Sequence, residues 1–551
     1  MKDFFSKTIK LIKEKIPVHN INEIKKNLIN NWYFPFSAIS FFYLNKTITQ
    51  GYTHGILIAF ILTIILSSQI PSINDLTKNN NKSLKLFSVL SAIGICLENQ
   101  ITFYPGWNIN YNFQFTLTKI LFVILSIPFL YFFILQFWNN IIKIIKENKI
   151  FKDIKKLEWI IYSILLIISI LYMAFAFSKS QAFYGTNYNY DIIYTSDSTT
   201  LIKDNSYLSL THPENDIRQP LFAVFSAPFV SIIYLITYFL KTSMTVQTIL
   251  INIVQILLLF ITNFLLTKIL NLNSTKRICF MVLSSFTYTQ LLFTLVMEQY
   301  IIAYFWLILC IFLIVNKKSN NSFALIGASG TLLTTMILFP LMSNKSPIKQ
   351  FKLWFIDMFK HALNFIGLFL LFCRFDIIVT LVSRLTFLSS FTGKYISFTN
   401  RIYQYTEFIK NCFIAPNAST SNIYEHISWQ LNPITKVSTI GIIILLIVII
   451  SVFINRKNKS SLLAAGWIVF SIIMLLILGW GTQENGLILY SLYFGWAYFV
   501  LIFQLIEKIE NKLKVKFLIP LTTIITSILL LIINVPAIIE LIKFAITNYP
   551  V

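Results

Sequence analysis

Long apolar runs separated by short polar connections dominate the chain from residue 33 onward. The runs lie at about 33–46, 52–71, 84–98, 114–138, 158–178, 221–240, 246–270, 278–297, 300–316, 323–342, 362–384, 437–455, 462–480, 486–506 and 517–541. They are continuous rather than alternating, which indicates helices and argues against a β-barrel. At roughly 20 residues for each crossing, the pattern predicts an all-α, polytopic transmembrane helical bundle of about 13–15 spans.

The composition excludes a water-soluble globule. Only 12% of the 551 residues are charged, against about 25% in soluble proteins. The net charge of +23 does not indicate nucleic-acid binding, because the basic residues cluster between apolar runs, where they would meet anionic membrane lipids. The five cysteines form no CxxC motif and lie mostly in apolar runs, so we expect buried, small hydrophobic side chains.

The distribution of Lys and Arg predicts how the chain is oriented. The densest basic stretch, 139–157, and the Lys-rich amphipathic residues 1–30 are expected in the cytoplasm. The N-terminus would then be cytoplasmic, with longer outer loops at 179–220 and 385–436. The Lys-, Asn- and Ile-rich usage is typical of a low-GC bacterium, so the predicted location is a bacterial plasma membrane.

Counting crossings from both ends produces one conflict. The count places Lys317 and Lys318 outside and Glu298 inside, against the charge rule. The sequence therefore predicts that one of the runs between 221 and 342 is broken or re-entrant.

Four segments follow from this pattern. Residues 1–30 form a cytoplasmic amphipathic segment, and 31–156 form an N-terminal membrane extension of several spans. Residues 157–342 form a core that includes the first outer loop. Residues 343–551 form the C-terminal spans with the second outer loop.

The first outer loop concentrates ionisable residues in a chain that has few. They are Asp191, Asp197, Lys203, Asp204, His212, Glu214, Asp216 and Arg218. Aromatic and aliphatic residues stand between the charges, so the loop is expected to pack on the membrane domain. Asp216 and Arg218 lie just before the span that starts at Leu221, where an acid and a guanidinium could face one lipid-linked substrate.

The order of these features resembles the GT-C fold of integral-membrane glycosyltransferases, such as protein O-mannosyltransferases and the aminoarabinose transferases of lipid A. The similarity lies in Thr195-Ser196-Asp197-Ser198-Thr199 in the loop and Arg218-Gln219-Pro220-Leu221 entering the next span. It covers mainly residues 158–320. Gln219 stands where many relatives have His, and the extension before residue 157 also departs from the family's pattern.

The resemblance implies a glycosyltransferase (a hexosyl- or related transferase) that takes a sugar from a polyprenyl-phosphate carrier at the outer face. The acceptor would be a cell-envelope glycan, lipid or protein. Asp197 would be the general base, and a single base without a covalent intermediate implies inversion at the anomeric carbon.

Further roles follow from the same resemblance and from the chemistry of the donor. Cations that would neutralise the lipid phosphate are Arg218, Lys203, Arg384 and Arg401. Candidate second acids are Glu298, Asp216 and Glu214, and candidate acceptor or sugar contacts are His212, Glu484 and Tyr424. A divalent cation, Mg²⁺ or Mn²⁺, could be held by Asp197 with Glu214 or Asp216.

Two other functions fit parts of the pattern. An O-antigen-type polymerase or ligase also has many spans and one large outer loop, a part that 385–436 could play. A lipid-linked glycan flippase or transporter would be expected to show inverted repeats or paired half-helices near mid-membrane. We find neither in the sequence.

Overall fold

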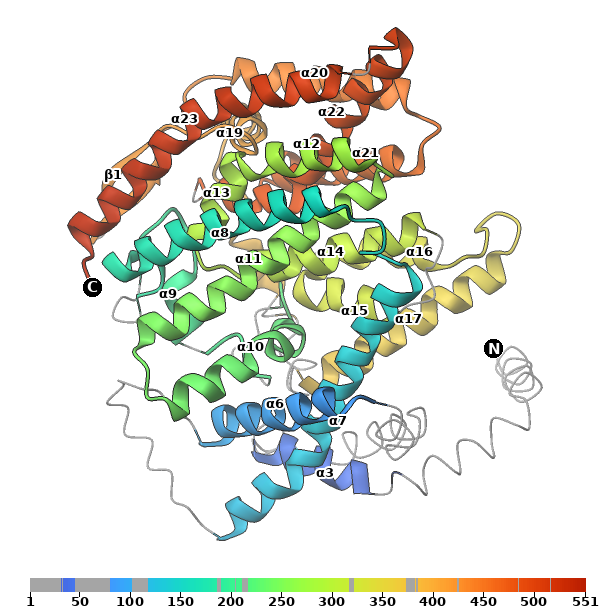
Figure 1. Ribbon diagram of the computed structural model, residues 1–551, viewed down its shortest axis with the longest axis vertical. Coiled ribbons are helices and arrows are strands. Elements are labelled where there is room, and N and C mark those ends of the chain that lie inside the picture. The colour runs from blue at the N-terminus through green and yellow to red at the C-terminus, as the bar shows by residue number, and fades with distance from the viewer. Residues whose placement is uncertain are drawn as a thin grey trace.

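The computed structural model describes residues 31, 33–44, 80–101, 117–185, 190–203, 205–210, 217–316, 322–372, 382, 385–423, 426–483, 485–515 and 517–551. These residues form a bundle of helices with one small hairpin at its edge (Figure 1). The helices that precede the first acidic loop are α3 (Tyr33–Leu44), α6 (Lys82–Ile101), α7 (Leu117–Glu147) and α8 (Lys156–Lys179).

The remaining elements follow in chain order. They are η1 (Gln181–Phe183), α9 (Ser198–Lys203), α10 (Phe222–Phe239), α11 (Met244–Ile269), α12 (Ser274–Ser285), α13 (Tyr288–Leu295), α14 (Tyr300–Val315), α15 (Ser322–Thr331), η2 (Leu333–Leu338), α16 (Phe339–Met342), α17 (Phe351–Phe372), α19 (Phe398–Asn411), β1 (Ala418–Ile423), β2 (His426–Leu431), α20 (Thr439–Ile454), α21 (Lys459–Ser471), η3 (Ile472–Ile477), η4 (Leu487–Tyr490), α22 (Ser491–Leu513) and α23 (Leu518–Asn548).

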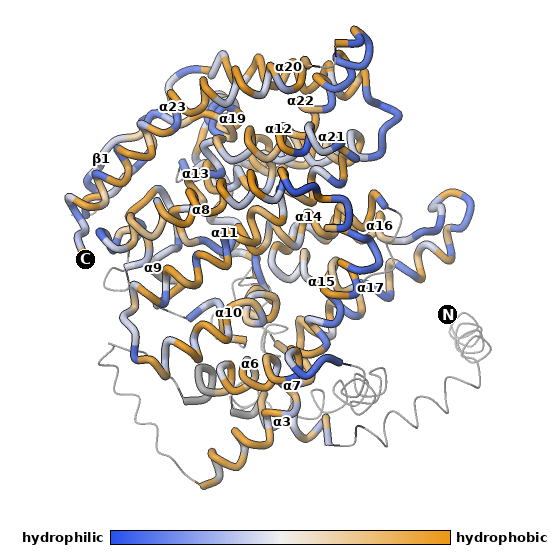
Figure 2. Tube along the Cα trace, in the orientation of Figure 1, coloured by the Kyte–Doolittle hydropathy of each residue, from blue (hydrophilic) through white to orange (hydrophobic). Residues whose placement is uncertain are grey.

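The described part of the chain contains eight helices that are long and apolar enough to cross a membrane, or nine if the bent pair α12–α13 counts as one span. Three shorter apolar helical stretches, Tyr300–Val315, Leu333–Met342 and Thr439–Ile454, add to them. Apolar residues run along most of the helices (Figure 2). The predicted class, a polytopic helical membrane protein, is confirmed, although the number of crossings falls below 13–15 in these residues. The run at 52–71 lies outside the described residues.

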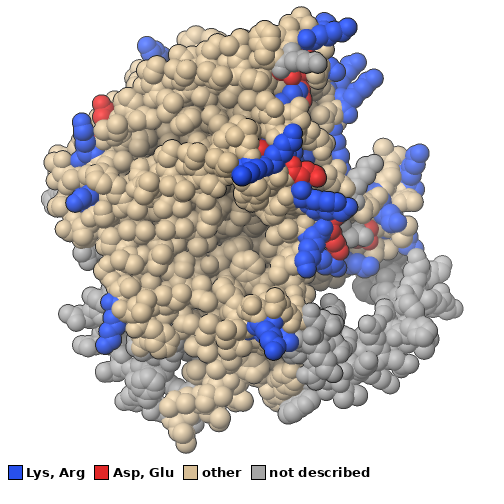
Figure 3. Space-filling model, in the orientation of Figure 1, with Lys and Arg blue, Asp and Glu red and all other residues tan. Residues whose placement is uncertain are grey.

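One end of the bundle, here called the basic end, gathers the lysines and arginines of several connections. Figure 3 shows them along one side of the molecule. Arg277 of α12 binds both carboxylate oxygens of Glu158 in α8, with N–O distances of 2.7 and 2.8 Å. Lys276 contacts Glu507 and Glu510 of α22 at 2.8 and 3.0 Å. These contacts place the starts of α8 and α12 and the end of α22 together.

The opposite end, here called the acid end, holds the first acidic loop and the end of α23. Ser180, which follows α8, places its hydroxyl 2.8 Å from the carbonyl oxygens of Ala545 and Tyr549. The Gln181 N–H also donates to the Tyr549 carbonyl, at 2.9 Å. The C-terminal ends of α8 and α23 are therefore joined, although 369 residues separate Ser180 from Tyr549.

The conflict in the count of crossings is resolved by two runs that do not carry the chain across. The Tyr184 and Thr245 hydroxyls are 2.9 Å apart, so α11 begins beside the end of α8. The segment between these helices, which includes α10, thus leaves and returns at the acid end. The run predicted at 323–342 is divided into α15, η2 and α16, each too short to cross. The count that placed Glu298 opposite Asp197 is therefore wrong.

The N-terminal helices pack directly on this core. Gly94 of α6 meets α10 so closely that an added Cβ would lie 2.7 Å from the Ser231 carbonyl oxygen. Phe137 of α7 packs edge-on against Phe229 and Trp306, at centroid distances of 5.3 and 5.7 Å. The four described cysteines, Cys96, Cys279, Cys310 and Cys412, are free and buried as predicted, and Cys373 lies outside the described residues.

The segment 385–436 is more structured than a loop. It contains α19 and the antiparallel hairpin β1–β2. The hairpin corrects the purely helical prediction. Its strands are rich in Ser, Thr and Asn and lack a strong alternation of apolar residues, which is the usual sequence signal of a strand.

The Glu158–Arg277 pair provides a test of the packing at the basic end. Glu158 is fully buried, so Arg277→Gln leaves an uncompensated carboxylate and is expected to cost about 3–5 kcal/mol of unfolding free energy. Denaturant unfolding in detergent would measure the loss. The double variant Glu158→Gln/Arg277→Gln should recover much of it. Lys143→Gln, which breaks an exposed pair with Glu147, should change stability by less than about 1 kcal/mol. An Arg277→Gln protein as stable as the wild type would contradict a stabilising role for the Glu158–Arg277 pair.

Candidate functional site

Asp197 and Glu298 meet at the acid end of the bundle. The Asp197 backbone N–H donates to Glu298 Oε1 at 2.6 Å, across 101 residues of sequence. Asp197 directly precedes α9, and its carbonyl accepts the Leu201 N–H of that helix at 3.0 Å. The residue is half-buried, so its side chain is partly accessible to solvent.

Glu298 lies in the connection between α13 and α14 and is fully buried. Gln255 of α11 holds this connection, because its Nε2 donates to the Glu298 carbonyl at 3.1 Å. The same amide donates to the Tyr207 hydroxyl at 2.6 Å. Glu298 Oε2 has no hydrogen-bond partner among the described residues. The Asp197 N–H thus holds the carboxyl group through Oε1, while Oε2 forms no hydrogen bond with a described residue.

Burial raises the pKa of the Glu298 carboxyl well above its ordinary value of 4.5, and the negative charge of Asp197 adds to the effect. A charged group taken out of water loses its hydration, and a second carboxylate nearby makes ionisation still less favourable. Burial and the neighbouring carboxylate therefore both favour the protonated form of Glu298.

The hairpin holds the loop that carries Asp197. The Tyr194 N–H donates to the Trp429 carbonyl at 2.7 Å, and the Trp429 N–H donates to Ile192 at 2.8 Å. The Tyr194 hydroxyl lies 2.6 Å from that of Tyr288, at the bend between α12 and α13. The expectation that this loop packs on the membrane domain is confirmed, since Ile192, Tyr194 and Tyr207 are buried.

A cavity of about 240 Å³ is lined by Gln299 and Tyr300, the two residues that follow Glu298 in the chain. Its lining residues are Arg218, Gln219, Gln299, Tyr300, Leu332, Leu333, Thr334, Leu388, Met474, Leu475, Trp480, Tyr490, Tyr493 and Phe494. Asp197 and Glu298 both interact electrostatically with the Tyr300 hydroxyl, which connects the acids to the cavity. The walls are mainly apolar and aromatic, and the polar groups are few.

Arg218 is the cation of this cavity. Its guanidinium carbon lies 4.5 Å from the ring centroid of Phe391, a cation–π contact. Its carbonyl accepts the Leu333 N–H at 2.9 Å, which fixes the backbone beside η2. The neighbouring Gln219 also lines the cavity, and its amide donates to the Tyr493 hydroxyl at 3.3 Å.

Arg401, the other described arginine of the predicted site, binds backbone instead. Its guanidinium donates to the carbonyls of Ile396, Ile477 and Gly393, with distances of 3.1 and 2.7 Å to the first two. The turn that it holds contains Gly479 and Gly481, both with positive φ, a conformation that glycine adopts without strain. The Gly481 N–H donates to the Phe391 carbonyl, so Arg401 positions the aromatic ring that Arg218 contacts.

Several predicted residues lie outside the described part of the chain. They are His212, Glu214, Asp216, Arg384, Tyr424 and Glu484. Lys203 is the last residue of α9, and its side chain is likewise not described. Roles for these residues stay predictions.

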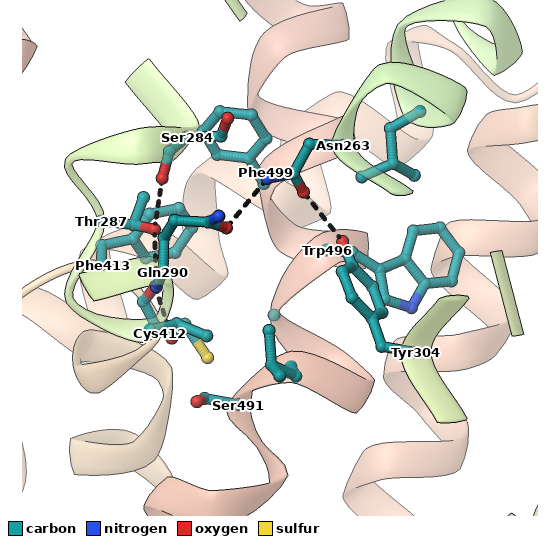
Figure 4. A pocket seen from close by; sticks show the side chains of 14 residues that line it. Asn263, Ser284, Thr287, Gln290, Tyr304, Cys412, Phe413, Ser491, Trp496 and Phe499 are labelled. Atoms are coloured by element: carbon teal, nitrogen blue, oxygen red, sulfur yellow. Dashed lines mark hydrogen bonds between the residues drawn. The ribbon is translucent and has the colours of Figure 1, made fainter. Parts of the chain in front are cut away.

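A second cavity, of about 40 Å³, lies deeper in the bundle (Figure 4). Asn263 donates to Gln290 at 2.8 Å and accepts from Tyr304 at 3.5 Å. Gln290 Nε2, Ser491 Oγ and Trp496 Nε1 are buried and lack partners among the described residues. The volume suffices for a few water molecules, at roughly 10–15 Å³ each, and not for a sugar.

No group of three or more His, Cys, Asp or Glu is placed to hold a metal ion among the described residues. Asp197 and Glu298 supply two carboxyl groups, fewer than the six to eight oxygen ligands that Ca²⁺ takes or the six that Mg²⁺ needs. The predicted partners of Asp197 in a Mg²⁺ or Mn²⁺ site, Glu214 and Asp216, lie outside these residues.

The chain matches no family model, no curated protein and no solved structure. The functional assignment therefore depends on the residues and their geometry.

Sequence reasoning missed the groups that support the acids. Gln255 and Tyr207 carry no motif, and only their position beside Glu298 identifies them. Tyr490 and Tyr493, which also carry no motif, line the cavity. The nearby turn Gly481–Gly486, with its positive-φ glycine, was the available signal.

The burial of Glu298 predicts a pH dependence. The folded state binds the carboxyl proton more tightly than the unfolded chain, so unfolding free energy should fall as pH rises above 4.5. The slope is about 1.4 kcal/mol per pH unit until the folded-state pKa is passed. Melting temperatures in detergent from pH 5 to 8 should decline less for Glu298→Gln, which keeps the oxygen that accepts the Asp197 N–H. The same decline of melting temperature with pH in both proteins would contradict a raised pKa for Glu298.

Proposed function

We propose that the protein is a membrane glycosyltransferase that moves a sugar from a polyprenyl-phosphate carrier to a cell-envelope glycan, lipid or protein. Under the positive-inside rule the basic end faces the cytoplasm, so the reaction takes place at the outer face of the plasma membrane. The GT-C-like fold and the bacterial origin are predictions from the sequence and form part of this proposal.

The observation that carries the proposal is the contact between Asp197 and Glu298, because Gln299 and Tyr300, which follow Glu298, line the same cavity as Arg218. Asp197 and Arg218, both from the first outer loop, and Glu298, between α13 and α14, were each selected from the sequence and support this proposal. An ionised acid, a guanidinium and an aromatic, apolar wall suit a substrate with a hydroxyl acceptor, a phosphate and a hydrocarbon chain.

The proposed reaction is a single displacement. The Asp197 carboxylate takes the proton of the acceptor hydroxyl as its oxygen bonds to the anomeric carbon. The bond from that carbon to the phosphate oxygen breaks, and the electron pair leaves with the polyprenyl phosphate. Arg218 lies where it can neutralise the charge that develops on the phosphate, and its planar fork suits two oxygens.

The second carboxyl group does not make the reaction a retaining one. A retaining enzyme needs an ionised carboxylate as nucleophile. Glu298 is fully buried, which raises its pKa and disfavours the ionised form that a nucleophile needs. It serves better as a positioning residue that holds the Asp197 backbone, which supports inversion.

The cavity wall supports the choice of a lipid-linked donor. Leu332, Leu333 and Met474 offer an apolar surface to the first isoprene units, while Tyr490 and Trp480 offer ring faces and a hydroxyl to a sugar. The Trp480 indole N–H donates to the Tyr490 hydroxyl at 2.9 Å, so the two rings are held in place before the substrate binds.

Asp197→Asn tests the base. The amide cannot accept the hydroxyl proton, so transfer to the acceptor should fall by about 10²–10⁴-fold while expression and membrane insertion persist. Transfer of radiolabelled sugar by purified protein would measure it, with Asp357→Asn on α17 as the control that retains activity. A fully active Asp197→Asn protein would exclude this base. NMR of the product is expected to show an inverted anomeric centre.

Arg218→Ala tests the donor site. Loss of a charge-assisted contact to phosphate should raise the KM for a short-chain polyprenyl-phosphate sugar by about 10- to 100-fold. Arg218→Lys should recover part of the affinity. Lys143→Gln, at the basic end, serves as the charge-matched control and should leave the KM unchanged. A normal donor KM in the Arg218→Ala protein would count against the assignment.

A further inference from the structure

A cleft opens at the basic end, on the opposite side of the bundle from the acids. It lies between the turn that joins α20 to α21 and the last turns of α22, and its volume is about 550 Å³. The lining includes Arg456, Lys457 and Lys508, with amide groups from Asn455, Asn458 and Asn511. The cleft is therefore mainly polar, and the catalytic proposal makes no use of it.

The charge of the cleft is strongly positive. Arg456, Lys457 and Lys508 are exposed, and none forms an ion pair with a described residue. Glu507 is the acid of the lining, and Lys276 of α12 already neutralises it at 2.8 Å. Three cations thus face one cleft without a protein carboxylate to balance them, which favours an anionic ligand.

An apolar surface continues directly from the cleft. Phe453, at 72% exposure, lies at its edge, and Ile450 and Leu446 follow it along the same exposed side of α20. They are spaced at three and four residues, so they form one stripe of a helix. A soluble anion would use the cations alone, whereas a lipid would also cover this stripe.

We propose that the cleft binds the head group of one anionic phospholipid, whose acyl chains lie along α20. Arg456 suits the phosphate because its guanidinium donates two parallel hydrogen bonds. Lys457 and Lys508 add charge, and basic pockets between helices at the cytoplasmic side are known to hold such head groups. The site is independent of the glycosyltransferase proposal.

Native mass spectrometry of the full chain tests this site. Protein is released from nanodiscs that contain equal amounts of phosphatidylglycerol and phosphatidylcholine, and the lipid that stays bound is counted. The wild type is expected to keep one phosphatidylglycerol in preference to phosphatidylcholine. The variant Arg456→Gln/Lys457→Gln/Lys508→Gln should bind it about 10- to 100-fold more weakly.

The matched control removes three lysines from the basic end outside the cleft, as Lys143→Gln/Lys146→Gln/Lys149→Gln. This control should bind phosphatidylglycerol like the wild type. Equal losses in both triple variants would mean a general surface charge effect and would overturn the proposal. Equal retention of the two lipids would overturn it too. Displacement of the lipid by millimolar inorganic phosphate would identify a free-anion site instead.

Discussion

The site depends on one hydrogen bond between a backbone amide and a buried carboxyl group, Asp197 N–H to Glu298 Oε1. A carboxyl group without water around it needs a donor, and the amide that precedes α9 supplies one. The bond therefore fixes the acidic loop to the connection between α13 and α14. Gln255 holds the same connection through the Glu298 carbonyl, and its amide also donates to the Tyr207 hydroxyl, so neutral, buried groups set the position of Glu298.

The class of the fold could be predicted from the sequence because low charge and continuous apolar runs leave few alternatives for a chain of this length. The path of the chain through the bundle could not be predicted in the same way. Apolar composition shows that a run can enter a membrane, but whether it crosses depends on its partners. Arg277 with Glu158, and Tyr184 with Thr245, decide which ends lie together. Their separation in the sequence leaves no local signal.

At the site, sequence reasoning selected the charged residues and missed those that hold them. Asp197, Arg218 and Glu298 stood out because charge is rare in this chain. Arg401 stood out for the same reason, yet its guanidinium binds three backbone carbonyls and supports the turn beneath Phe391. A cation near a site can therefore act on the ligand or on the backbone, and only the geometry tells which.

The join between Ser180 and Tyr549 also bears on how the protein is made. A ribosome adds about 5–20 residues per second, so the 369 residues between these positions take roughly 20–75 s to synthesise. During that interval α8 and the loop that carries Asp197 wait in the membrane without α23. The hairpin that pairs with Tyr194 also comes late, at residues 418–431. The candidate site is thus among the last parts of the molecule to assemble, because the hairpin and α23, which hold its loop, are made late.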